Sequence, residues 1–196
     1  CQHCFLGDDV TKIRPLLSVE EIKKSYLSYS RNIGGVSLTG GEPFMRPDIV
    51  ELCNVFQEGR AVKSIAINTN GWNPDYIEKQ VREILANAPR KQSIRMTISL
   101  DGLEKTHDFI RERKGAFNNA VASIRKLKAL SLEDQRLIVN AQVTFVQFNK
   151  KEFYKLYDFV KNDLEVKLSF NWYRDGRAFG VDENLIFSPD NREDPI

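Results

Sequence analysis

The chain has 196 residues, of which 41% are hydrophobic and 29% are charged, and its net charge is +2. This length is enough for one sizeable domain with its own core. The near-neutral charge argues against a dedicated nucleic-acid binder, and no apolar run approaches the roughly 18 residues that span a bilayer. Three cysteines do not form a disulfide framework. We therefore expect no nucleic-acid or membrane partner and a cytoplasmic location.

Helical and strand patterns alternate along the chain. A capping box of Ser18 and Glu21 predicts the start of the first helix, Asp48 is the expected cap of the second, and Asn73 opens the third. Later apolar stripes predict helices over 116–129 and from about 153. Strands are predicted at 35–38, 63–68, 94–100, 137–146 and 166–172. Because the pattern stops after Gly180, we expect a domain over 1–180 and a tail or linker over 181–196.

This alternation predicts βαβ units and a parallel sheet, whose strands bind ligands at their carboxyl ends. Three polar or glycine-rich clusters fall at these ends. They are Thr39-Gly40-Gly41-Glu42, Thr69-Asn70-Gly71 and Ser99-Leu100-Asp101-Gly102. We therefore expect them to meet at one edge of the sheet.

The amino-terminal run Cys1-Gln2-His3-Cys4 offers two thiols at C-x-x-C spacing. Thiolates are soft ligands that suit an iron–sulfur cluster, but the same spacing also occurs in zinc half-sites and redox dithiols. The third cysteine, Cys53, lies on an apolar helical stripe, so we interpret it as a small core residue.

In this order, the cysteine pair, Gly40-Gly41-Glu42-Pro43 and Ser99-Leu100-Asp101-Gly102 resemble the radical S-adenosylmethionine (SAM) enzymes. The resemblance covers nearly the whole chain, and a following His107-Asp108 and Arg111 favour the branch that modifies peptides or builds cofactors. It implies an α/β fold, a partial (β/α)6 TIM-like barrel. Its first strand and one further cluster cysteine are expected upstream of Cys1.

The resemblance also implies a chemistry. A reduced [4Fe-4S] cluster passes an electron to SAM, which breaks into methionine and a 5′-deoxyadenosyl radical. That radical takes a hydrogen from a peptide or a small molecule. Flavodoxin or ferredoxin is the expected electron donor, and no residue is assigned a catalytic acid–base role.

The implied site residues follow from the same motifs. Cys1 and Cys4 match the second and third cluster ligands, and the Gly40-Gly41-Glu42 turn receives the SAM ammonium, largely through carbonyl oxygens. Ser99 bonds the SAM ribose or carboxylate, Arg111 pairs with that carboxylate, and Asp101 lines the substrate side. Period two places Asn140 and Gln142 on one strand face, either inside the barrel against SAM or substrate or at a polar seam.

Alternatives remain open at this point. The charge run from Arg111 to Lys114 is also typical of a solvated surface, and Thr69-Asn70-Gly71 of a plain turn. For the whole chain, the alternatives are a zinc or dithiol module that uses Cys1 and Cys4, and a non-catalytic or degenerate barrel.

Overall fold

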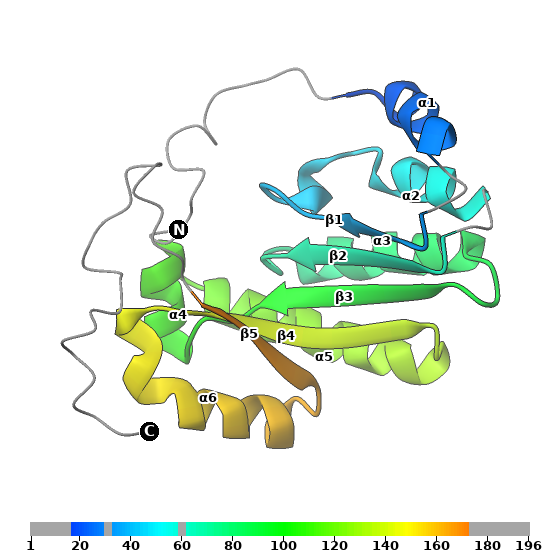
Figure 1. Ribbon diagram of the computed structural model, residues 1–196. Helices are drawn as coiled ribbons and strands as arrows, with labels where there is room; N and C mark the ends of the chain where they lie inside the picture. The colour runs from blue at the N-terminus through cyan, green and yellow to red at the C-terminus, as the bar shows by residue number, and fades with distance from the viewer. Residues whose placement is uncertain (1–16, 30–32, 59–61, 173–196) are drawn as a thin grey trace.

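Five parallel strands, each paired with the next along the chain, form the sheet of the protein (Figure 1). The computed structural model describes residues 17–29, 33–58 and 62–172. The strands are β1 (Gly35–Leu38), β2 (Ser64–Thr69), β3 (Ser93–Ser99), β4 (Leu137–Phe145) and β5 (Lys167–Trp172). All four neighbouring pairs are parallel, in the order β1-β2-β3-β4-β5. The predicted strands agree with these bounds to within one residue, and the expected α/β fold with a parallel sheet is confirmed.

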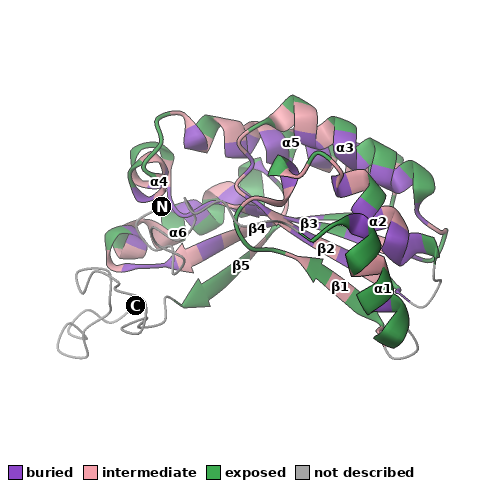
Figure 2. Cartoon of the chain, turned by 90° about the horizontal axis from the view of Figure 1, so that it is seen from above, coloured by how far each residue is buried: buried purple, intermediate pink, exposed green. Residues whose placement is uncertain are grey.

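Helices connect the strands and cover one face of the sheet, as Figures 1 and 2 show for α3 and α5. The α-helices are α1 (Val19–Tyr29), α2 (Ile49–Glu58), α3 (Pro74–Asn87), α4 (Glu104–Arg111), α5 (Ala116–Glu133) and α6 (Phe153–Asp158). Short 3-10 turns, η3 (Pro43–Met45) and η4 (Gln147–Glu152), follow β1 and β4, and a π-helical turn, η5 (Phe159–Asp163), extends α6. No described helix is long and apolar enough to cross a membrane.

The two faces of the sheet differ in character because side chains alternate along each strand. Towards the helices, Ile65, Ile67, Ile94, Met96 and Ile98 are fully buried in the hydrophobic core. The opposite face carries mostly polar residues, and Figure 2 shows it without a covering layer of described helices. A curved parallel sheet with one helix-covered face is the architecture of a partial barrel.

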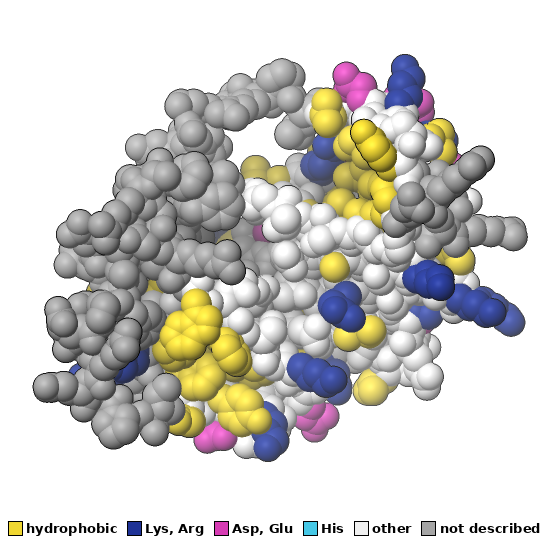
Figure 3. Space-filling view, viewed as in Figure 1, with side chains coloured by type: hydrophobic (Ala, Val, Ile, Leu, Met, Phe, Trp, Pro, Cys, Tyr) yellow, Lys and Arg dark blue, Asp and Glu magenta, His cyan; other side chains and the backbone are white. Residues whose placement is uncertain are grey.

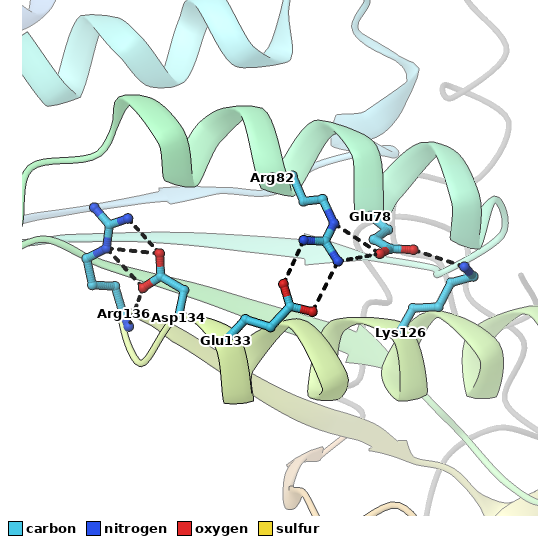
Figure 4. Close-up of polar contacts among 6 residues, drawn as sticks. All are labelled: Glu78, Arg82, Lys126, Glu133, Asp134 and Arg136. Carbon is cyan, nitrogen blue, oxygen red and sulfur yellow. Dashed lines mark hydrogen bonds and ion pairs between the residues drawn. The ribbon is translucent and has the colours of Figure 1, made fainter.

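Ion pairs join α3 and α5 on the outer surface (Figure 4). Arg82 contacts Glu78 at 3.0 Å and Glu133 at 2.9 Å, and Lys126 contacts Glu78 at 2.9 Å. Arg136 holds Asp134 and donates to the carbonyl oxygens of the α3 end. Each exposed ion pair contributes little to the free energy of unfolding. The main effect of this network is therefore to fix how α3 and α5 align with each other.

Most local predictions from the sequence are confirmed. The Ser18 hydroxyl accepts from the Glu21 amide at 3.2 Å, and Asn73 caps α3 by accepting from the Tyr76 amide. Asp48 lies at the N-cap position of α2, where its carbonyl oxygen accepts from the Leu52 amide at 2.9 Å, while its carboxylate contacts Arg46 at 2.7 Å. The sequence reading also missed α4, whose eight residues bury only His107 and Ile110. The predicted tail at 181–196 lies outside the described residues.

Candidate functional site

The turn after β1 leaves two glycines open on the surface. Gly40 has a φ of +128°, a conformation that favours glycine, and a Cβ on either Gly40 or Gly41 would meet nothing within 4 Å. The backbone at this strand end is therefore uncovered by described residues, and a ligand can approach its carbonyl oxygens closely. Such a surface fits an ammonium group, which only donates hydrogen bonds.

The carboxylate of Glu42 joins this turn to the end of β2. It accepts hydrogen bonds from the Thr69 hydroxyl at 2.8 Å, the Asn70 amide at 2.7 Å and the Phe44 amide at 3.2 Å. Charge-assisted bonds of this kind are about twice as strong as neutral ones. Glu42 therefore holds the glycine turn in place. The sequence predicted Glu42 as part of the glycine turn, but gave no sign that Thr69 and Asn70 were its partners.

The turn after β2 is rigid for a steric reason. Gly71 has a φ of +72°, and a Cβ there would lie 2.9 Å from both the Ala120 Cα and the Ile98 side chain. Ser123 of α5 donates to the Gly71 carbonyl oxygen at 2.8 Å. The Thr69-Asn70-Gly71 motif thus supports the site through packing against α5, in keeping with its interpretation as a turn.

Asp101, which follows β3, is fully buried, and both of its carboxylate oxygens contact other residues of the protein. Its Oδ1 accepts from the Thr144 amide at 2.8 Å, and its Oδ2 contacts the Arg111 guanidinium at 2.5 Å. The prediction that Asp101 lines the substrate side is therefore wrong. The surface interpretation of Arg111 is also wrong, since its side chain is only 13% exposed. A role for Arg111 in binding the SAM carboxylate stays a prediction.

Three further polar residues hold together the segments that follow β3 and β4. His107 Nδ1 accepts from the Asp101 amide at 2.9 Å, and Asp108 accepts from the Gly115 and Phe117 amides at the start of α5. Asn149 donates to the carbonyl oxygens of Asp101 and Thr144, at 2.8 Å each. The sequence did not predict a role for Asn149, because this residue lies in the η4 turn and belongs to no motif.

Ser99 and Asn140 lie on the polar face of the sheet. Ser99 is in register with Gln142 of β4, and Asn140 is in register with Thr97 of β3 and Lys167 of β5. Ser99, Gln142 and Asn140 are partly exposed. The structure therefore brings the glycine turn and Ser99 to the carboxyl edge of the sheet and Asn140 to its polar face, while their contacts with SAM stay predictions.

The expected cluster ligands, Cys1 and Cys4, and the intervening His3 lie outside the described residues. Cys53 is confirmed as a core residue, and burial raises the pKa of its thiol to about 12. A thiol held protonated in this way is a poor metal ligand. Among residues 17–29, 33–58 and 62–172, no three His, Cys, Asp or Glu side chains come together to hold a metal ion.

Comparisons with known proteins agree on one family. A family model described as the radical SAM superfamily matches residues 1–160. The antilisterial bacteriocin subtilosin biosynthesis protein AlbA of Bacillus subtilis (strain 168) is 28% identical over 189 residues, which are 95% of this chain and 38% of that protein.

Two further relatives extend this picture. Fe-coproporphyrin III synthase of Methanosarcina barkeri is 25% identical over 173 residues, 87% of this chain and 40% of that protein. Molybdenum cofactor biosynthesis protein 1 of Homo sapiens is 33% identical over 130 residues, 64% of this chain and 19% of that protein. The chain spans less than half the length of each of these relatives.

Proposed function

The chain belongs to the radical SAM superfamily, and from this premise we propose that it binds SAM at the carboxyl edge of its sheet and takes part in hydrogen abstraction from a substrate. Members of this family use a [4Fe-4S] cluster and SAM. When bound, this pair supplies the electron and the 5′-deoxyadenosyl radical, and the protein supplies binding and orientation.

The observation that carries this proposal is the open glycine turn. Gly40 and Gly41 present uncovered backbone at the end of β1, and Glu42 anchors that turn to β2 through three hydrogen bonds. A backbone surface fixed in this way is preorganised, so a ligand loses little free energy in ordering it.

Different residues of the chain would then bind different parts of SAM and the cluster. The carbonyl oxygens of Gly40 and Gly41 accept from the ammonium of SAM, and Ser99 and Asn140 offer a hydroxyl and an amide from the polar face. Cys1 and Cys4 are the cluster ligands that we propose from the sequence. Because Asp101 and Arg111 pair beneath this surface, they keep the ends of β3 and β4 rigid.

The names of the relatives guide our proposal for the substrate. Their names refer to the biosynthesis of a bacteriocin and of a molybdenum cofactor and to the synthesis of Fe-coproporphyrin III. We propose a peptide or a small molecule on a cofactor pathway as substrate, a flavodoxin or ferredoxin as electron donor, and a cytoplasmic location. We also propose 1–180 as the SAM-binding domain and 181–196 as a linker.

The direct test is anaerobic reconstitution of the full-length protein, followed by metal analysis and incubation with SAM and dithionite. We expect about four irons per chain and release of 5′-deoxyadenosine. Cys4→Ala should abolish both, while the core variant Cys53→Ala should keep both. Stoichiometric zinc would favour the zinc module, and iron without 5′-deoxyadenosine would favour a non-catalytic barrel.

A further inference from the structure

The five strands contain only two charged residues, and both are cations. Arg95 lies in β3 and Lys167 begins β5, whereas no aspartate or glutamate occurs in any of the described strands. Charged residues in a parallel sheet are unusual, because both faces of such sheets are commonly covered. The placement of these two cations therefore calls for a physical reason.

Both cations lie on the open, polar face. Ile94 and Met96, which flank Arg95, are fully buried, and Leu168 beside Lys167 packs against the core. Alternation then directs Arg95 and Lys167 to the opposite face, where both are exposed. Dark blue side chains stand over the white, polar surface of this face in Figure 3.

The strand register places the two cations near each other. Arg95 is in register with Ile138 of β4, and Lys167 is in register with Asn140, two residues further along β4. With strands about 4.8 Å apart and a rise of about 3.3 Å per residue, their Cα atoms lie about 12 Å apart. Side chains of this length reach an anionic group held between them.

Neither cation forms an ion pair with a described acidic residue, in contrast to four arginines elsewhere among the described residues. Arg46, Arg82, Arg111 and Arg136 each contact a carboxylate. Two neighbouring cations repel each other, so an anion between them is stabilised by both. The planar guanidinium of arginine and the ammonium of lysine are the groups that proteins use for phosphate and carboxylate.

We propose that the open face of the sheet binds an anionic group of the substrate, a phosphate or a carboxylate, between Arg95 and Lys167. This inference rests on the proposed function, to which it adds that the substrate lies against the open face. Arg95 lies four residues before Ser99, about 13 Å back along β3, so the anion site is distinct from the SAM-binding strand ends.

The test is calorimetric titration of the reconstituted full-length protein with inorganic pyrophosphate and, separately, with succinate. We expect binding of at least one of the two, weakened about tenfold by Arg95→Gln or Lys167→Gln and by more in the double variant. Lys79→Gln removes an exposed cation on α3 and serves as the matched control. The affinity should also fall as salt is added.

The outcomes separate the two proposals. Binding of pyrophosphate alone assigns a phosphate, and binding of succinate alone assigns a carboxylate. No binding of either probe, or equal binding by the parent and the double variant, overturns the anion site. Displacement of the probe by saturating SAM also overturns it, because the site would then belong to SAM. Failure of the proposed function is read independently, as a lack of 5′-deoxyadenosine from the parent protein.

Discussion

The Glu42 carboxylate accepts a hydrogen bond from the Thr69 hydroxyl at 2.8 Å, and so joins two strand ends that lie 27 residues apart in sequence. The same carboxylate accepts from the Asn70 amide at 2.7 Å. A single side chain thus fixes the glycine turn against the neighbouring strand. This makes Glu42 a positioning residue for the surface on which we propose that SAM binds.

We expect Glu42→Gln to lower the free energy of unfolding by about 2 kcal/mol, since the amide leaves buried donors without a charged acceptor. The affinity for SAM should fall about tenfold as the turn loosens. Urea unfolding and equilibrium SAM binding measure the two effects. Glu51→Gln, an exposed residue of α2, is the control and should change neither. Unchanged stability of Glu42→Gln would contradict the anchoring role.

The buried pair of Asp101 and Arg111 gives a second prediction. Asp101→Asn should cost about 3 kcal/mol of unfolding free energy, because the largely buried Arg111 guanidinium loses its ion pair with the Asp101 carboxylate. The double variant Asp101→Asn/Arg111→Met should be less destabilised than the sum of the two single variants. Strict additivity in a double-mutant cycle measured by urea unfolding would show that the pair does not interact.

Gly71 gives a prediction about packing. Gly71→Ala should destabilise the protein by about 3 kcal/mol, because the new Cβ strains a positive φ and also meets the backbone of Ala120 at 2.9 Å. Gly115 also has a positive φ, of +83°, but nothing lies near its Cβ position. Gly115→Ala should therefore cost only about 1 kcal/mol. Equal losses in thermal unfolding would remove the steric argument.

Lowering the pH should reduce the free energy of unfolding, partly because Asp134 becomes protonated. The hydrogen bond from Arg136 lowers the pKa of this carboxyl in the folded state. The stability that this provides is present above the unfolded-state pKa and is lost as pH falls through the folded-state value. We therefore expect Asp134→Asn to be less stable at pH 7, and to lose less than the parent between about pH 5 and pH 1. Parallel curves of thermal midpoint against pH would contradict this.

The sequence was informative where local patterns decide structure. Strand alternation around Ile65 and Ile94 and the caps at Ser18 and Asn73 predicted their elements, because each signal lies within a few residues. The order of strands and helices also placed the glycine turn at the correct sheet edge.

The sequence was less informative where partners lie far apart in the chain. Asp101 was wrongly expected to line the substrate side, since its partner Thr144 is 43 residues away. The run from Arg111 to Lys114 reads as a surface, yet Arg111 turns inward to neutralise a buried carboxylate. Asn149, which bridges two strand ends, has no local signal at all. Such contacts depend on tertiary packing and cannot be read from spacing.

The central claim, that SAM binds on the open glycine turn, is tested most directly by its dissociation constant in Gly41→Val. A Cβ at Gly41 meets nothing within 4 Å, so the fold should keep its unfolding midpoint while the added side chain occupies the space of the ligand. Gly34→Val makes the same change in equally open surroundings just before the start of β1. We expect SAM binding at least thirtyfold weaker, about 2 kcal/mol, in Gly41→Val alone. Equal affinity in the parent and both variants would contradict the account.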